Sequence, residues 1–160
     1  MKRRTFVTGA AVAATSCRRS PPSHWRTLTD SEAETLGVLC SEIIPPDDYP
    51  GAQQAGAVAF IDIQLTKHHR VHRAKYREGL ARAEELAAES FNRPLAKLSA
   101  SERMRLTQEL ERVDPAFFAM LVAHTMQSYY GSPRHGGNRD AVSWRMLRVP
   151  PVQVRGRGPA

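Results

Sequence analysis

Residues 114–131 read Asp-Pro-Ala-Phe-Phe-Ala-Met-Leu-Val-Ala-His-Thr-Met-Gln-Ser-Tyr-Tyr-Gly and carry the signals of a helix from start to end. Asp114 is a residue type that caps helix N-termini, and Pro115 is favoured at the first helical position. Gly131 is the residue type at which helices commonly end. The apolar side chains recur at helical spacing, which predicts a long amphipathic helix. Its expected core-facing residues are Phe117, Phe118, Leu121, Val122, Thr125 and Met126.

Four more helices are predicted upstream of this one. Capping boxes at Thr29–Glu32 and Ser99–Glu102 open two of them, because each hydroxyl can accept a backbone N–H while the glutamate reaches back. The predicted ranges are 29–43, 54–67, 71–90 and 99 through 110. The expected inward residues are Leu36, Leu39, Cys40 and Ile43; Ala55, Val58, Ala59 and Ile63; Tyr76, Leu80, Ala83, Leu86 and Ala87; Leu106 and Leu110. Since no alternating strand pattern occurs, the sequence predicts an all-α fold, an irregular bundle of about five helices.

The N-terminus has the pattern of an export signal, with a positive start, a short apolar run and small residues before a cleavage point. Arg3 and Arg4 form the twin-arginine variant, which exports folded proteins. Cys17 lies where a lipoprotein cysteine would, but Ala14 replaces the usual large aliphatic residue, so lipidation and ordinary cleavage remain alternatives. The predicted organisation is a leader over 1–17, a tether over 18–27, one helical domain over 28–150 and a basic, disordered tail over 151–160.

The charge distribution argues against a nucleic-acid partner. The chain has a formal net charge of +7, yet nine of its 23 Lys and Arg residues lie in residues 1–19 and 145–160. All 16 acidic residues lie in residues 20–144, which therefore carry a net charge of −2. A nucleic-acid-binding module is expected to carry its basic excess on the folded surface. The basic ends instead fit export and contact with an anionic surface.

The segment after the long helix combines aromatic residues with turn residues in a short stretch. We predict a structured loop whose rigid Gly136-Gly137-Asn138 turn exposes Asn138. Aromatic anchors on a rigid frame dominate many interfaces, so this loop is the predicted partner-binding surface. The alternative is that its aromatic residues only close the core of the bundle itself. The predicted contact residues are Tyr129, Tyr130, Arg134, His135, Gly136, Gly137, Asn138 and Trp144.

The residues with reactive side chains do not form a convincing catalytic or cofactor site. His68, His69 and His72 are close in sequence, but the surrounding lysines and arginines and the lack of a neighbouring carboxylate or thiolate argue against a metal. His124 has no nucleophile or acid arranged with it. Cys40 lies on the apolar stripe of the first helix, which favours a buried, inert thiol. A disulfide from Cys40 to another chain remains the alternative in an exported protein.

Three parts of the chain resemble the gluconate 2-dehydrogenase subunit 3 family, over roughly residues 30–150. The matching residues are Ile44-Pro45, Pro50-Gly51-Ala52, Ile61-Asp62, Tyr130-Gly131, Pro133, Gly136-Gly137-Asn138 and Trp144. Three departures are visible: Ser132 stands where the family commonly has an acidic or amide residue, Arg148 stands where a glycine is usual, and the basic tail from Val152 to Ala160 has no counterpart in the resemblance.

The resemblance implies a small subunit that binds no flavin or haem itself. Its implied partner is a large FAD-containing dehydrogenase, often joined by a multihaem cytochrome c. The twin-arginine translocase would export the pair, which places the protein on the periplasmic side of the inner membrane. Two alternatives remain open from the residues alone: an independent exported scaffold lipoprotein, and a small metal-dependent enzyme that uses the cluster from His68 to His72.

Overall fold

A computed structural model describes residues 24–150, and no strand occurs within that range. The six α-helices of this range are α1 (Asp30–Ile43), α2 (Ala57–Leu65), α3 (Arg73–Phe91), α4 (Ala100–Val113), α5 (Pro115–Tyr130) and α6 (Val142–Met146). The predicted all-α fold is confirmed. The leader with Arg3, Arg4 and Cys17, the first part of the tether and the tail over 151–160 lie outside the described residues.

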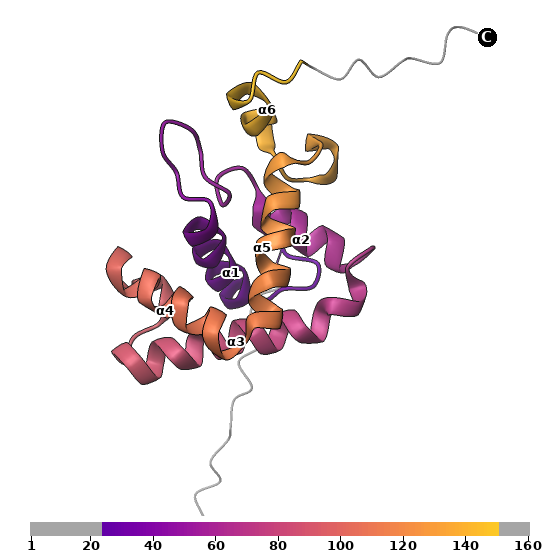
Figure 1. Cartoon of the computed structure of the whole chain (residues 1–160). Coiled ribbons are helices and arrows are strands. Elements are labelled where there is room, and N and C mark those ends of the chain that lie inside the picture. Colours follow the sequence, from indigo (N-terminus) through magenta and orange to yellow (C-terminus); the bar gives the residue numbers. More distant parts are fainter. Residues whose placement is uncertain (1–23, 151–160) are drawn as a thin grey trace, which may run out of the picture.

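Helix α5 is the centre of the molecule and contacts each of the other five helices. Figure 1 shows it running between α1 and α2, with α3 and α4 across one end and α6 at the other. The loop that joins α1 to α2 lies at the same end as α6. None of the described helices is both long enough and apolar enough to cross a membrane.

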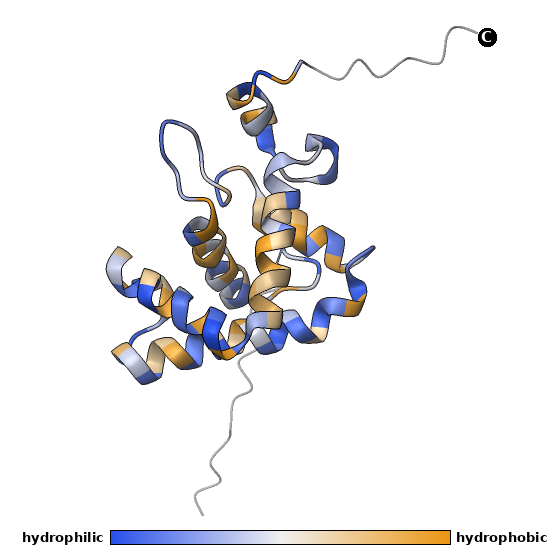
Figure 2. Ribbon diagram, viewed as in Figure 1, coloured by the Kyte–Doolittle hydropathy of each residue, from blue (hydrophilic) through white to orange (hydrophobic). Residues whose placement is uncertain are grey.

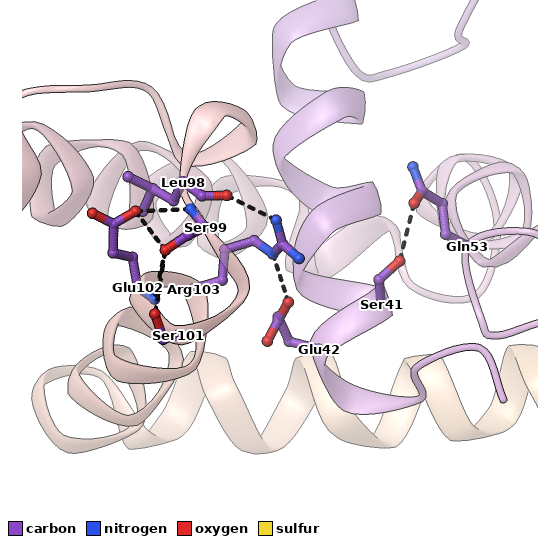
Figure 3. Close-up of polar contacts among 8 residues, drawn as sticks. All are labelled: Ser41, Glu42, Gln53, Leu98, Ser99, Ser101, Glu102 and Arg103. Atoms are coloured by element: carbon purple, nitrogen blue, oxygen red, sulfur yellow. Dashed lines mark hydrogen bonds and ion pairs between the residues drawn. The ribbon is translucent and has the colours of Figure 1, made fainter.

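The helices begin where the capping signals predicted. In α1 the Glu32 backbone N–H donates to Thr29 Oγ1 at 3.2 Å, and the Thr29 N–H donates to the Glu32 carboxylate at 2.7 Å. The same box opens α4, where the Ser99 N–H donates to the Glu102 carboxylate at 2.8 Å (Figure 3). The Asp114 carboxylate caps α5 by accepting the Phe117 N–H at 3.1 Å. Each cap satisfies backbone donors that a helix start leaves unpaired.

Arg103 fastens α4 to α1. Its Nε donates to the Glu42 carboxylate at 2.7 Å, and its Nη1 donates to the Leu98 carbonyl at 2.8 Å (Figure 3). At the end of α1, Ser41 Oγ donates to the Gln53 side chain at 3.0 Å, which ties the helix to the loop that follows. Planar guanidinium groups suit such double contacts because their donors have a fixed geometry.

The core is built from the predicted faces of α1, α3, α4 and α5. Every residue predicted inward on α3 and α4 is buried, as are Leu36, Leu39 and Cys40 on α1. Hydrophobic residues cover much of α2 and α5, whereas α3 and α4 alternate between hydrophobic and hydrophilic stretches (Figure 2). On α5 the prediction was partly wrong, because Met126 is 43% exposed and Phe118 and Val122 are only half-buried.

The second predicted helix is shorter than its expected range of 54–67. Gly56 has a φ of 91°, which favours glycine and forms the N-cap of α2, so residues 52–56 form a turn instead. Phe60 and Ile61 are buried, whereas Ala59 and Ile63 are half-buried. Since α2 contacts both α1 and α5, it buries more than one narrow stripe. The third helix likewise begins at residue 73, after a 3-10 turn over Arg70–His72.

The last part of the predicted tether belongs to the folded domain. The buried carboxylate of Asp62 on α2 accepts backbone N–H groups from Arg26 at 2.8 Å, Thr27 at 2.8 Å and Leu28 at 3.2 Å. It also accepts the Thr27 hydroxyl at 2.8 Å. Residues 26–28 are thereby held against α2, and Leu28 is buried in the core.

Candidate functional site

The C-terminal loop, residues 131–149, leaves α5 through a capped helix end. The Gly131 N–H donates to the Gln127 carbonyl at 3.0 Å, and a 3-10 turn over Pro133–His135 follows. Gly136 then adopts a φ of 96°. A side chain at the neighbouring Gly137 would place its Cβ 2.5 Å from the Ser128 carbonyl oxygen, so only glycine fits this close approach to α5.

Asn138 holds the C-terminal loop together from the inside. Its Nδ2 donates to the Gly131 carbonyl at 2.9 Å, and its Oδ1 accepts the Ser143 N–H at 3.0 Å. The side chain is 0% exposed. The prediction that this turn exposes Asn138 was therefore wrong, since the amide is used to join the loop ends. An Asn138 substitution would disturb the loop itself and is a poor probe of partner contact.

The C-terminal loop is strained as well as rigid. Asn138, Asp140 and Ala141 have φ values of 44°, 57° and 52°. This left-handed region is unfavourable for residues that carry a Cβ, Ala141 above all. The Ala141 N–H donates to the Asn138 carbonyl at 2.9 Å, which holds the conformation. Backbone strain of this kind concentrates at functional sites.

The C-terminal loop packs on the loop between α1 and α2, so two of the segments that carry the family resemblance meet in space. The Tyr129 hydroxyl donates to the Pro50 carbonyl at 2.9 Å. The Arg139 N–H donates to the Ala55 carbonyl at 2.9 Å. Both segments lie at one end of the molecule in Figure 1. They form one continuous structure, although almost 80 residues separate Tyr129 from Pro50.

The eight predicted contact residues divide by exposure into a supporting frame and an accessible face. Tyr129, Gly137 and Asn138 are buried, and Gly136 and Trp144 are half-buried. Tyr130, Arg134 and His135 are exposed. The Trp144 Nε1 donates to the Tyr130 carbonyl at 3.0 Å, and the rings of Tyr129 and Tyr130 meet edge to face at 5.1 Å. We call Tyr130, Arg134, His135 and Trp144 the aromatic face.

Two grooves adjoin this end of the molecule. One has a volume of about 450 Å³, and no acidic residue lines it. Its lining residues are Phe60, Gln64, Lys67, His68, Gln127, Gly131 and His135. The other has a volume of about 380 Å³ and includes Trp25 and Arg139. The first groove connects the aromatic face to the histidine-rich segment that begins at His68.

The histidines are arranged differently from their order in the sequence. His68 is exposed, whereas His69 and His72 converge with His124 from α5. One ring nitrogen from each of these three lies within 4.8 Å of the others. We call His69, His72 and His124 the histidine cluster. His124 is 52 residues from His72 in the sequence, and no local pattern predicts that it joins the other two.

His124 is neutral at physiological pH. Burial lowers its pKa to about 4, and the nearby rings of His69 and His72 add to the effect. Its Nδ1 lies 2.9 Å from the Tyr76 hydroxyl, whose own pKa is raised well above 10 by burial. The Tyr76 hydroxyl and the His124 Nδ1 form a hydrogen bond with each other, so they are not arranged as an acid–base pair for a substrate.

Cys40 is fully buried and reduced. Its Sγ lies 3.4 Å from Thr125 Oγ1, and burial raises the pKa of the thiol to about 12. This structure favours the inert-thiol interpretation over a disulfide to another chain, since the sulfur has no access to a partner.

The chain matches the family model described as gluconate 2-dehydrogenase subunit 3 over residues 30–151. No curated protein and no solved structure matches the chain. The family match spans all six helices and the whole C-terminal loop. This protein therefore belongs to the gluconate 2-dehydrogenase subunit 3 family.

Proposed function

We propose that this chain is the non-catalytic small subunit of a periplasmic, membrane-associated oxidoreductase of the gluconate 2-dehydrogenase type. Its partner is an FAD-containing large subunit, which it helps to fold and to export through the twin-arginine pathway, and a multihaem cytochrome c can complete the complex. The observation that carries this proposal is the family match over residues 30–151, because members of this family are described as subunit 3 of gluconate 2-dehydrogenase.

The chemistry of the described residues supports a binding role. The buried thiol of Cys40, with a pKa of about 12, is not a nucleophile at neutral pH. The imidazole of His124 is turned toward Tyr76 within the bundle. Flavin and haem chemistry is therefore assigned to the partner subunits.

The aromatic face supports the proposed contact with the large subunit. Tyr130 is 39% exposed, and the exposed apolar residues Leu147 and Val149 follow in the same C-terminal loop. Exposed apolar groups on a strained, rigid loop provide large contact area at a low entropic cost, which is the property of interface anchors. Tyr129, in contrast, closes the core of this chain, as the alternative interpretation expected for the aromatic residues.

Purification of the tagged full chain from its native membrane is expected to recover an FAD-containing flavoprotein in stoichiometric amount. Arg134→Glu should reduce that recovery at least tenfold, because it reverses an exposed charge on the aromatic face without touching the core. The control is Lys97→Glu, an exposed reversal in the turn between α3 and α4 at the other end of the molecule. Undiminished recovery with Arg134→Glu would place the interface elsewhere, and no flavoprotein at all would refute the subunit proposal.

Replacement of Arg3 and Arg4 by lysine is expected to leave this chain and its flavoprotein partner in the cytoplasm. The twin-arginine pathway recognises the arginine pair, and lysine keeps the charge while removing the recognised group. Cell fractionation with an immunoblot for both subunits measures the effect. The matched control replaces Arg18 and Arg19 by lysine, and it should be exported normally. Normal export of the first variant would show that this signal does not use the pathway.

A further inference from the structure

We propose that the histidine cluster, His69, His72 and His124, binds one divalent transition-metal ion of the zinc type. No part of the subunit role proposed above requires such an ion, so this is a separate property of the chain. The three imidazoles come from two elements that are more than 50 residues apart in sequence, and they meet at one point on the surface of the bundle.

Local structure brings the first two rings to the same side. His69 precedes a 3-10 turn that ends at His72, and the His72 N–H donates to the His69 carbonyl at 2.9 Å. Side chains three residues apart in such a turn lie above one another. Their ring centroids are 6.0 Å apart, and His124 lies 3.9 Å from His69 and 5.6 Å from His72.

A metal site here requires a change of ring orientation as well as a small closure, because the rings of His69 and His124 are stacked, with an interplanar angle of 16°. A tetrahedral zinc ion with Zn–N bonds of about 2.0–2.1 Å separates its ligand nitrogens by roughly 3.4 Å. The nitrogens of the histidine cluster already lie within 4.8 Å of one another. His69 and His72 are only half-buried, so the His69 ring can rotate out of the stack and the His72 ring can turn toward His124 without repacking the core. Three histidines with one open position are a known ligand set for zinc.

The surrounding groups prepare His124 to be a ligand. When the Nδ1–H of His124 donates to the Tyr76 hydroxyl oxygen, at 2.9 Å, this tautomer places the lone pair on Nε2, and a hydrogen bond at the second nitrogen typically orients a ligating histidine. Gln127 Oε1 lies 3.1 Å from Nε2 of His69, and the exposed Gln127 side chain can follow that ring when it rotates.

The nearby cations weaken the site less than the sequence suggests. Lys75 donates to the Asp114 carboxylate at 2.8 Å, and Arg73 Nε donates to the Leu65 carbonyl at 2.6 Å. These two cations are therefore engaged with other partners, and the remaining two, Lys67 and Arg70, are exposed to solvent, which screens their charge. Because the cluster contains no carboxylate, it should select metals that prefer imidazole, such as zinc, nickel and copper, over magnesium or calcium.

The test is titration of the full chain, purified without a histidine tag, with Zn²⁺ by calorimetry and with Co²⁺ by visible absorption. We expect one equivalent of Zn²⁺ to bind, a higher Tm, and the d–d bands of nitrogen-ligated Co²⁺. His72→Ala should weaken Zn²⁺ binding at least tenfold. Tyr76→Phe, which keeps the ring but removes the hydroxyl, should weaken it by about 10- to 100-fold through loss of orientation.

The matched control is His68→Ala, which removes an exposed histidine from the same segment but outside the histidine cluster. It should bind Zn²⁺ as the wild type does. Mg²⁺ should produce no change in Tm. Circular dichroism establishes that each variant is folded before titration. Absence of stoichiometric Zn²⁺ binding by the wild type, or equal losses in His68→Ala and His72→Ala, would overturn the proposal.

Discussion

Asp62→Ala is expected to lower the free energy of unfolding by about 3 kcal/mol, because a buried carboxylate that accepts several hydrogen bonds is lost. Asp62 is 3% exposed and accepts the backbone N–H groups of Arg26, Thr27 and Leu28. Without it, these donors can be satisfied only if the segment leaves α2. Leu28 would then also lose its place in the core. Chemical denaturation at pH 7 measures the difference.

Part of the contribution of Asp62 should be lost in acid, because the interactions that favour the carboxylate over the carboxylic acid depend on pH. Burial raises the pKa of the carboxyl, but the hydrogen bonds from Arg26, Thr27 and Leu28 outweigh it, so the pKa in the folded protein lies below the ordinary value of 3.8. The folded state therefore binds the proton less readily than the unfolded state. The pH-dependent stabilisation by Asp62 is therefore present above pH 3.8, and it is lost as the pH falls through the lower pKa of the folded state.

The difference between the wild type and Asp62→Ala should accordingly be constant from pH 7 to pH 5 and should shrink towards pH 3. Asp48→Ala, which removes an exposed carboxylate on the loop after α1, is the control and should be nearly neutral. A variant Asp62→Ala as stable as the wild type at pH 7 would show that residues 26–28 do not contribute to the folded domain.

Gly79→Ala is expected to cost about 3 kcal/mol, because the core at this position has no space for a methyl group. A Cβ at Gly79 would lie 2.3 Å from Cγ of the Phe117 ring, and that ring is fully buried. Phe117 also packs edge to face against Tyr76 at 5.7 Å, so it cannot move aside freely. The crossing of α3 over α5 therefore depends on a glycine within a helix.

Gly37→Ala is the matched control, since it also adds a methyl group to a buried glycine within a helix. Its nearest contacts would be with the exposed Gln53 side chain, which can move away at the cost of its hydrogen bond from Ser41. The gain in helix propensity, about 1 kcal/mol, should offset most of that cost. Thermal or urea unfolding should therefore separate the two variants by several kcal/mol.

A second substitution distinguishes steric conflict from other causes of instability. Phe117→Leu in the Gly79→Ala background removes the ring that the methyl group would strike. The double variant should be more stable than the sum of the single effects predicts, which is the mark of residues in contact. Additive effects, or a Gly79→Ala variant no less stable than Gly37→Ala, would contradict the close approach of α3 and α5.

The sequence alone determined the helices, because their signals are local. The capping residues Thr29, Ser99 and Asp114 and the 3.6-residue periodicity of apolar residues act within a few positions of each other. The family resemblance was also readable from sequence, through the segments that contain Pro50 and Trp144. The limits of α2 were predicted less well, because the left-handed Gly56 is one of several residues at which that helix could have begun.

The tertiary structure alone decided which polar side chains are used inside the molecule. Asn138 reads as an exposed turn residue, and Asp62 reads as one polar residue on an apolar helix. Asp62 is buried because donors from residues 26–28 meet it, and Asn138 is buried because it joins Gly131 to Ser143 inside the folded C-terminal loop. The histidine cluster has the same origin: His68 and His69 are neighbours in sequence, but only His69 faces His124. Such groupings depend on how the helices cross, and local propensity carries no record of contacts between residues more than 30 positions apart.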